Sequence, residues 1–287
     1  MTNHKPSSLN GKLLLASLAF AGLAFTSAAK ADTPVPVTIT SGFNKDVVAD
    51  GDSASSSTTA GIDGTASTAT AFYDSTWASA VYPGNSTVAA GAFPAGTTVD
   101  GYSLAPAVGK NALVMGNQNA TDFPPSTGTG SLSLSETGAS TLYVLGTSGN
   151  GSSILDYTLT FAGGATQDGT LTFDDWGSGG NVITGLSRVN IAANTYDSDH
   201  PGIFGLYADP ITVDPTDLTK ALTSISFTYD SAATSAANPT QGGNGVASIF
   251  AVSEVGAVPE PSTWALLLGG MGVLILMVRR TRAPSAR

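Results

Sequence analysis

The fold follows from one stretch of the chain, Ile154-Leu155-Asp156-Tyr157-Thr158-Leu159-Thr160-Phe161. Its apolar residues fall at every second position, so the odd-numbered residues from Leu155 to Phe161 share one face of an extended chain. This pattern is typical of a β-strand with one buried face. Two turn-forming pairs, Gly163-Gly164 and Asp168-Gly169, bracket a turn into a second run, Thr170–Phe173. The sequence therefore predicts a β-hairpin here.

Shorter runs of the same kind recur on both sides of this hairpin. They lie at residues 71–73, 102–104, 112–115, 132–134, 142–145, 188–191, 203–207, 222–229 and 248–252. Residues 35–39 predict a further strand at a sheet edge, where Pro36 is tolerated. About ten short strands joined by Gly, Asp and Asn turns predict an all-β fold, an antiparallel β-sandwich of the jelly-roll type. No helix longer than one turn is expected, with residues 217–222 as the one exception.

The body of the chain, residues 32–257, is long enough for one all-β domain of ordinary size. It holds twenty acidic residues and only four basic ones, a net charge of −16. Nucleic acids and anionic lipids bind cationic surfaces, so this charge argues against both as partners. The chain has no cysteine, which excludes disulfides, thiol catalysis and Cys-ligated zinc. Residues 52–70 are rich in Ser, Thr and Ala, and we expect a loop or loosely paired strand that cannot hold a core.

Three pieces follow one another after the body. Val258-Pro259-Glu260-Pro261 keeps the backbone extended, because proline fixes φ and blocks helix propagation. Residues 264–278 carry no charge, and at about 1.5 Å per residue they predict a short transmembrane helix of roughly 22 Å. A basic membrane stop at residues 279–282 follows, and its arginines are Arg279, Arg280 and Arg282. Arginines favour the cytoplasmic side, so residues 283–287 are predicted to be a cytoplasmic tail.

In this order the pieces resemble the PEP-CTERM sorting signal of Gram-negative bacteria, over residues 258–282. The resemblance implies recognition by exosortase, a membrane-embedded cysteine protease-transpeptidase, with processing near Pro259-Glu260-Pro261. It also implies export across the inner membrane and a final place at the cell envelope or surface, or outside the cell after processing. The same tail carries an ice-binding-protein C-terminal label, although nothing in these residues indicates ice binding.

The start of the chain predicts a cleaved signal peptide, residues 1–31. Two lysines precede an apolar run at residues 13–25, which matches the basic and hydrophobic regions of such a leader. Small residues at Ala29 and Ala31 suit signal peptidase, and cleavage after Ala31 leaves Asp32 as the new N-terminus. Cleavage after Ala29 is the alternative.

Short motifs in the body carry a second resemblance. They are Gly42-Phe43-Asn44, Ser148-Gly149-Asn150-Gly151, Phe161 with Asp168-Gly169, Asp175-Trp176 and Ile249-Phe250-Ala251-Val252-Ser253. Together they look like ectodomains often carried by PEP-CTERM proteins, which in turn resemble galactose-binding-like sandwiches. Such sandwiches often bind carbohydrate, so the resemblance implies the sandwich fold and hints at an extracellular polysaccharide, without assigning a sugar site.

The best local cluster for a glycan contact is Asp174-Asp175-Trp176. An indole ring can stack on a sugar while neighbouring carboxylates bind its hydroxyls. The alternative is a tryptophan packed in the core beside solvated acids. A carboxylate pair for glycoside hydrolysis is available among these aspartates, Asp156 and Glu136. On so acidic a surface, however, two neighbouring carboxylates are expected by chance.

Aspartate-rich loops offer the hard oxygen ligands that calcium requires. The candidates are Asp46 with Asp50 and Asp52, and Asp197 with Asp199. Neither set follows the EF-hand pattern, and no other cofactor is expected. His200 is the only histidine after the leader. A Ser-His-Asp triad or a histidine-based zinc site is therefore disfavoured, and its turn context predicts an exposed structural residue.

The sequence favours a non-catalytic, exported protein that signal peptidase and exosortase process. Its role would lie at the cell surface or in extracellular polymer, as a carbohydrate-binding or structural component. A secreted polysaccharide hydrolase or lyase on the same sandwich is the alternative, and a self-associating matrix protein that binds no glycan is a third hypothesis.

Overall fold

A computed structural model describes residues 33–63, 69–116, 128–178, 180, 182–237, 245–256 and 271. Contacts divide the chain into residues 1–31 and residues 32–287, and every described residue belongs to the second unit. The predicted signal peptide, sorting motif, basic stop and cytoplasmic tail lie outside the described residues, as does the predicted membrane helix except for Met271. In the part of the chain that is described, no helix is both long and apolar enough to span a membrane.

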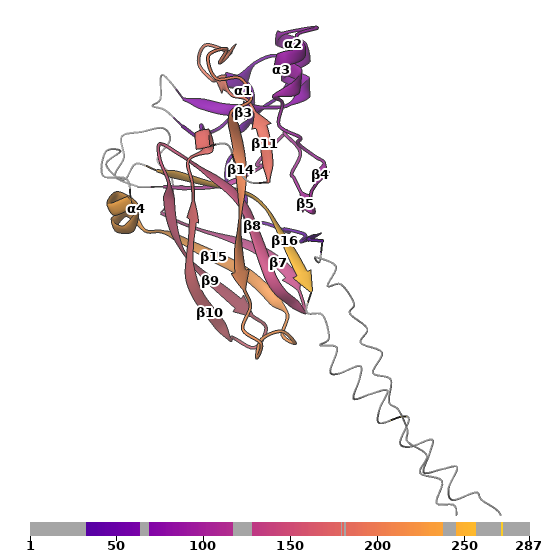
Figure 1. The fold of residues 1–287 in the computed structure, drawn as a ribbon, viewed down its shortest axis with the longest axis vertical. Coiled ribbons are helices and arrows are strands. Elements are labelled where there is room, and N and C mark those ends of the chain that lie inside the picture. Colours follow the sequence, from indigo (N-terminus) through magenta and orange to yellow (C-terminus); the bar gives the residue numbers. More distant parts are fainter. Residues whose placement is uncertain are drawn as a thin grey trace, which may run out of the picture. The chain divides into compact units, whose positions relative to one another are not determined.

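Most of the described chain forms curled antiparallel β-sheets (Figure 1). The larger main sheet is ordered β1 (Val35–Pro36), β16 (Val246–Gly256), β8 (Ala139–Gly149), β14 (Phe204–Thr212) and β11 (Ile183–Leu186), with β6 (Leu113–Gly116) beside the first half of β16. The smaller main sheet is ordered β10 (Thr166–Phe173), β9 (Ser153–Phe161), β15 (Leu222–Tyr229) and β7 (Thr129–Glu136). All strand pairs in these two sheets are antiparallel, as predicted.

One hydrophobic core fills the space between these two sheets. The predicted alternation of β9 is confirmed, because its residues 155, 157, 159 and 161 are at most 9% exposed while Asp156 between them is exposed. Ile225 and Phe227 of β15 lie in the same core, to which the larger sheet adds Leu142 and Ile249. The β9–β10 hairpin also forms, although β10 begins at Thr166 and includes the predicted turn pair Asp168-Gly169.

The outer face of the larger sheet is buried as well. Leu145 of β8, Leu206 of β14 and Phe250 of β16 belong to a second core that residues from the first third of the body complete. The ring centroids of Phe72 and Phe93 lie 5.9 and 5.3 Å from that of Phe250. The larger sheet is therefore covered on both faces, which the sequence pattern did not predict.

A smaller αβ region supplies this cover. Its sheet is ordered β13 (Thr195–Tyr196), β12 (Val189–Asn190), β3 (Thr70–Tyr73) and β2 (Val48–Ala49), and β2 pairs with β3 in parallel. Helices α1 (Ala54–Ser57), α2 (Ser75–Val81) and α3 (Ser86–Ala90) gather beside it, at the upper end in Figure 1. The remaining elements are the two-stranded sheet β4 (Thr98–Val99) and β5 (Tyr102–Ser103), the 3₁₀-helix η1 (Trp176–Ser178) and α4 (Ser231–Ala237).

The expectation that no helix exceeds one turn was wrong. The Asp74 carboxylate caps α2 by accepting hydrogen bonds from the backbone N–H groups of Thr76 (2.9 Å) and Trp77 (3.0 Å). The Asn85 side chain caps α3 in the same way, accepting from the N–H of Val88 at 3.2 Å. Such caps satisfy N–H groups that a helix start leaves unpaired. By contrast, the expected helix at 217–222 is a turn.

The interpretation of residues 52–70 as a loop without core residues was also wrong in its described part. Ala54, Ala60 and Ile62 are fully buried. Ala54 packs in the core of the αβ region, while Ala60 and Ile62 join the core on the outer face of the larger sheet. Small side chains let the backbone approach its neighbours closely, so a stretch of low hydrophobicity still fills a core.

Residues 37–45 tie the two main sheets together along one side. The N–H of Val37 donates to the carbonyl of Val252 in the larger sheet (3.0 Å), and the N–H of Thr40 donates to the carbonyl of Ser133 in the smaller one (2.9 Å). The crossing turns at Gly42, whose φ is +124°. A Cβ at this position would clash with the backbone oxygen of Ser131, so only glycine fits.

We predict that Gly42→Ala lowers the free energy of unfolding by at least about 3 kcal/mol, because it adds a backbone clash to an unfavourable φ. Gly84→Ala is the matched control: Gly84 also has a positive φ, +78°, but an added Cβ would have nothing within 4 Å. It should cost about 1–2 kcal/mol. Urea unfolding of the purified proteins measures both, and equal losses would contradict the proposed close approach.

Candidate functional site

The predicted glycan cluster lies where β10 leads into η1. Trp176 is only 1% exposed, and its ring lies 4.6 Å from the Phe204 ring and 5.2 Å from the Phe72 ring. A buried indole has no free face for a sugar, so the predicted contact at Trp176 is corrected to a core position. Asp174 is exposed, and its Oδ1 accepts a hydrogen bond from the hydroxyl of Ser152 at 3.2 Å.

The carboxylate of Asp175 forms hydrogen bonds with the backbone of two loops. Its Oδ2 accepts a hydrogen bond from the N–H of Gly151 at 2.7 Å, and its Oδ1 accepts one from the N–H of Gly177 at 2.8 Å. Its backbone carbonyl accepts a hydrogen bond from the hydroxyl of Tyr207 at 3.2 Å. Both carboxylate oxygens are therefore used to fix the turn after β8 and the start of η1, which is a structural role.

Arg188 is a polar centre that the sequence did not reveal. Its guanidinium lies 4.8 Å from the ring centroid of Phe204 and 5.6 Å from that of Trp176. It also forms ion pairs with Asp63 (3.2 Å) and Asp197 (2.7 Å). Cation–π contacts and paired carboxylates stabilise a partly buried guanidinium. Arg188 thereby joins β12 to the aromatic core over the larger sheet.

The second calcium candidate is part of this ion-pair system. Asp197 accepts hydrogen bonds from Arg188 and from Nδ1 of His200, the latter at 3.0 Å. Burial raises the pKa of Asp197, but these hydrogen bonds outweigh it and bring the pKa below its usual value. His200 is exposed, as predicted, with 48% of its side chain accessible. Asp197 is thus engaged by Arg188, and Asp199 lies in the turn beside it, where its N–H donates to Oδ1 of Asp197 at 3.1 Å.

Asp46, from the first calcium candidate, is a buried carboxylate that anchors a loop. It accepts hydrogen bonds from Nδ2 of Asn111 at 2.6 Å and from the N–H of Gly109 at 3.1 Å. Asn111 in turn donates to the carbonyl of Ala107 and accepts from the N–H of Val47. Burial raises the pKa of Asp46 to about 6, against the hydrogen bonds, which lower it.

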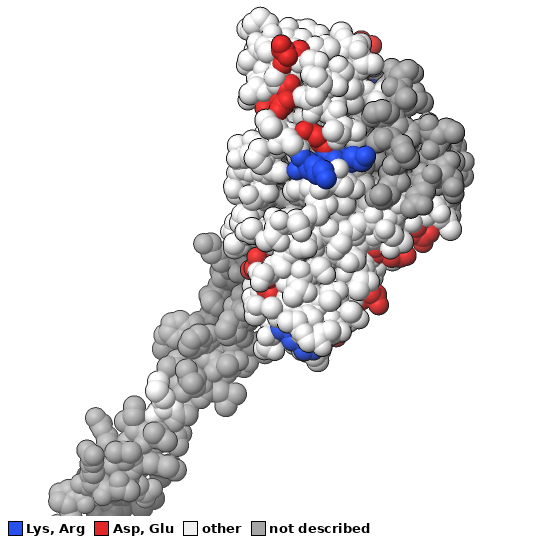
Figure 2. Space-filling model, turned by 180° about the vertical axis from the view of Figure 1, so that it is seen from behind, with Lys and Arg blue, Asp and Glu red and all other residues white. Residues whose placement is uncertain are grey.

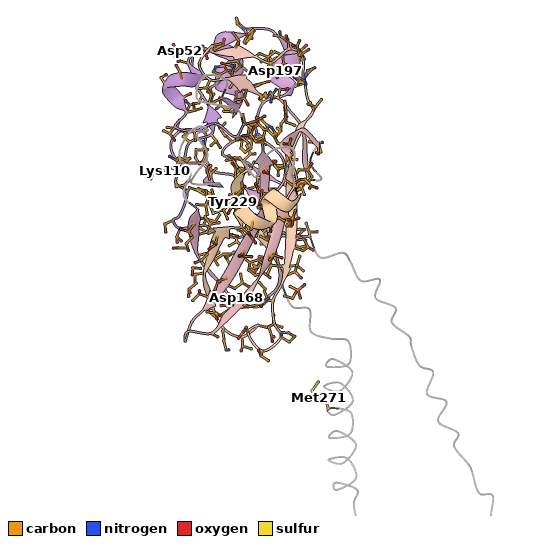
Figure 3. All side chains as sticks on the ribbon, turned by 90° about the vertical axis from the view of Figure 1, so that its left-hand side faces the viewer. Asp52, Lys110, Asp168, Asp197, Tyr229 and Met271 are labelled. Atoms are coloured by element: carbon orange, nitrogen blue, oxygen red, sulfur yellow. The ribbon has the colours of Figure 1, made fainter. Side chains whose placement is uncertain are left out.

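The structure does not support calcium binding by Asp46, Asp50 and Asp52 together. Within the described ranges, no three or more carboxylate or histidine side chains lie close enough to hold a metal ion. Asp52 is exposed at the same end of the domain as Asp197 (Figure 3), whereas Asp46 is turned into the protein toward Asn111. Asp46 and Asp50 lie close enough to interact electrostatically, but among the described residues they belong to no cluster of three such side chains.

The described chain leads directly into the segment predicted for sorting. β16 ends at Gly256, where the hydroxyl of Ser140 donates to the carbonyls of Val255 (3.0 Å) and Gly256 (3.3 Å). β1 pairs with the end of this strand, so that Val35 lies opposite Glu254. Both ends of the described domain are thus fixed side by side by backbone pairing.

Comparison with known proteins confirms the sorting prediction. Residues 257–282 match the family model of the PEP-CTERM protein-sorting motif. The motif marks an exported protein that exosortase targets, and it implies a place at the cell surface or envelope of a Gram-negative bacterium. The match covers Val258, Pro259, Glu260 and Pro261 as well as Arg279, Arg280 and Arg282. None of the curated proteins matches the chain.

We predict that Trp176→Ala lowers the free energy of unfolding by about 3–5 kcal/mol, because it leaves a cavity in an aromatic core. Asp174→Asn is the control and should change it by no more than about 0.5 kcal/mol, since the side chain is exposed. Urea unfolding distinguishes the two variants. Full stability of Trp176→Ala combined with lost polysaccharide binding would restore the glycan interpretation.

Asp46→Asn tests the buried carboxyl. Between about pH 4 and pH 6 the folded protein keeps a proton on Asp46 that the unfolded chain has lost, so this group stabilises the fold on acidification and loses that effect as pH rises. We expect the free energy of unfolding of the wild type, relative to Asp46→Asn, to increase as pH falls from about 7 to about 4. Urea unfolding across this range measures it, and parallel curves for the two proteins would contradict the raised pKa.

Proposed function

We propose that this protein is a non-catalytic component of the cell surface or of extracellular polymer, delivered by removal of its signal peptide and by exosortase processing. The observation that carries the proposal is the sorting motif that begins directly after β16. The matched motif begins at the residue that follows β16, so sorting delivers the β-domain as its cargo.

The strand order supports a jelly-roll body. Eight strands, β6 to β10 and β14 to β16, make up the two main sheets apart from the short β1 and β11. In chain order these eight occupy one sheet as first, eighth, third and sixth, and the other as second, seventh, fourth and fifth. Apart from the fourth and fifth, which form the β9–β10 hairpin, successive strands lie in opposite sheets, as in two nested Greek keys.

A binding or structural role fits the side chains better than catalysis. The carboxylate of Asp175 accepts hydrogen bonds from two backbone N–H groups, and that of Asp197 accepts one from Arg188. The carboxylate of Asp46 accepts hydrogen bonds from Asn111 and from the N–H of Gly109. A catalytic acid or base must instead face a cleft where it can reach a substrate. We therefore propose extracellular polysaccharide as the partner of the body, with membrane attachment through residues 264–278 before processing and no contact with nucleic acid.

Intact-mass analysis of the protein from its native envelope and culture medium tests the delivery route. We expect a mature species that begins near Asp32 and ends near Pro259 to Pro261, with or without an added group at the new end. The control is Glu260→Ala, which should leave the tail uncleaved and the species ending at Arg287. A wild-type species that still ends at Arg287 would mean a plain C-terminal anchor and would overturn the proposal.

A further inference from the structure

We propose that Lys45 and Lys110, together with the groove beside them, form a binding site for a carboxylate-bearing polysaccharide. This inference rests on the proposed function in one respect, namely that the protein is delivered to the cell surface or beyond, where such polysaccharides occur. The site itself follows from charge, exposure and the path of two chain segments.

The first observation concerns the four basic residues of the body. Two of them are neutralised by acids of the same chain: Arg188 by Asp63 and Asp197, and Lys220 by Asp217 at 2.6 Å. Lys45 and Lys110 have no ion-pair partner among the residues described. Among the residues that the structure describes, they are therefore the two cations that no acid of the same chain neutralises.

The backbone brings these two lysines together. Lys45 and Ala112 form an isolated antiparallel bridge, and the N–H of Asn111 donates to the carbonyl of Lys45 at 2.9 Å. Lys110 is the residue before Asn111 and is exposed. Buried hydrogen bonds of Asp46 and Asn111 fix the conformation of this loop. The backbone that carries the two lysines is therefore ordered.

The second observation is a groove of about 310 Å³ formed by the same two segments. One wall contains Ile39 and Phe43, and the other contains Leu104 and Pro106. Neither lysine lines the groove, but Lys45 follows Phe43 by two residues and Lys110 follows Pro106 by four, so each lysine lies on the continuation of a lining segment. Phe43 is only partly buried and offers ring surface to the groove. Val108, between Pro106 and Lys110, is 81% exposed and adds apolar surface at the same loop.

The short range of charge interactions explains why an anion would bind in this place. Figure 2 shows basic side chains gathered at mid-height on one face, with an acidic side chain directly beside them and further acidic side chains toward the ends and edges. Figure 3 places Lys110 along the side of the domain, between the end that carries Asp197 and the end that carries Asp168. At physiological ionic strength charges are screened beyond roughly 8 Å. The lysines then act on an anion only at short range, so a polyanion is held where its carboxylates reach them.

An acidic sugar chain matches both parts of this surface. Its carboxylates pair with the lysine ammonium groups, while the C–H faces of its rings pack against Phe43 and its apolar neighbours. A neutral glycan would leave the lysines unused, and an acidic peptide would lack rigid apolar ring faces to fill the groove. The combination of two unpaired cations with an apolar groove therefore favours the acidic polysaccharide.

The test is equilibrium binding of the purified full chain, in mild detergent, to polygalacturonate, with dextran as the neutral polymer and polyglutamate as the acidic peptide. We expect binding to polygalacturonate alone, and a loss of about tenfold or more in affinity for Lys45→Ala/Lys110→Ala. Lys220→Ala removes one lysine that already has its own acid and should bind within about twofold of the wild type. Lys45→Arg/Lys110→Arg should retain binding, because the charge is preserved.

Each other outcome has a defined meaning. Unchanged binding by a folded Lys45→Ala/Lys110→Ala variant, with an unaltered urea midpoint, overturns the site. Equal binding of dextran overturns the charge argument, and equal binding of polyglutamate assigns the surface to acidic peptides instead. Intact-mass analysis of the same proteins reports on delivery separately. A normally processed protein that binds no polygalacturonate refutes this inference alone, whereas an unprocessed protein that binds it refutes the proposed delivery alone.

Discussion

The pairing of β16 is the interaction on which the rest of the domain depends. This strand pairs with β8 along most of its length, with β6 beside its first half and with β1 beside its end. Its side chains alternate between two cores: Ala247, Ile249 and Val252 face the space between the main sheets, while Val246, Phe250 and Ala251 face the αβ region. The alternation is interrupted at Phe250 and Ala251, two neighbouring residues that both belong to the core on the αβ side. The pairing with β8 shifts its register at the same place, between Ile249 and Ala251. A strand buried on both faces leaves no polar side to solvent, so both layers must form around it.

The sequence predicted the strands whose two faces differ. β9 alternates because one side meets the core and the other meets water, and the same holds for β15. The central strand β16 has buried residues at its first eight positions, so its pattern carries no information about which side is covered. For the same reason the sequence did not predict the second core or the αβ region that completes it.

The sequence does contain local signals for the starts of helices α2 and α3, which the prediction of an all-β fold did not take into account. Asp74-Ser75-Thr76-Trp77 and Asn85-Ser86-Thr87-Val88 share one pattern, a capping residue followed by Ser-Thr and an apolar residue, and each starts a helix. For the candidate site, the sorting motif in the tail was predictable because the motif is defined by the order of its residues in the sequence. The positions of Trp176 and Arg188 could not be predicted. A tryptophan beside acidic residues has the same sequence pattern in a sugar-binding site and in a core, and only the packing of Trp176 and Arg188 against Phe204 shows that this one belongs to a core.

The attachment of the tail to β16 also has a mechanical consequence. A load applied through the residues after Gly256 acts along the axis of β16, which is bonded to β8 over residues 139–149. Such a load shears the backbone hydrogen bonds of the ladder together instead of opening them one after another. The two flanking cores must slide at the same time, since β16 contributes side chains to both. The domain would therefore resist traction applied at the end of β16 by shear of this ladder.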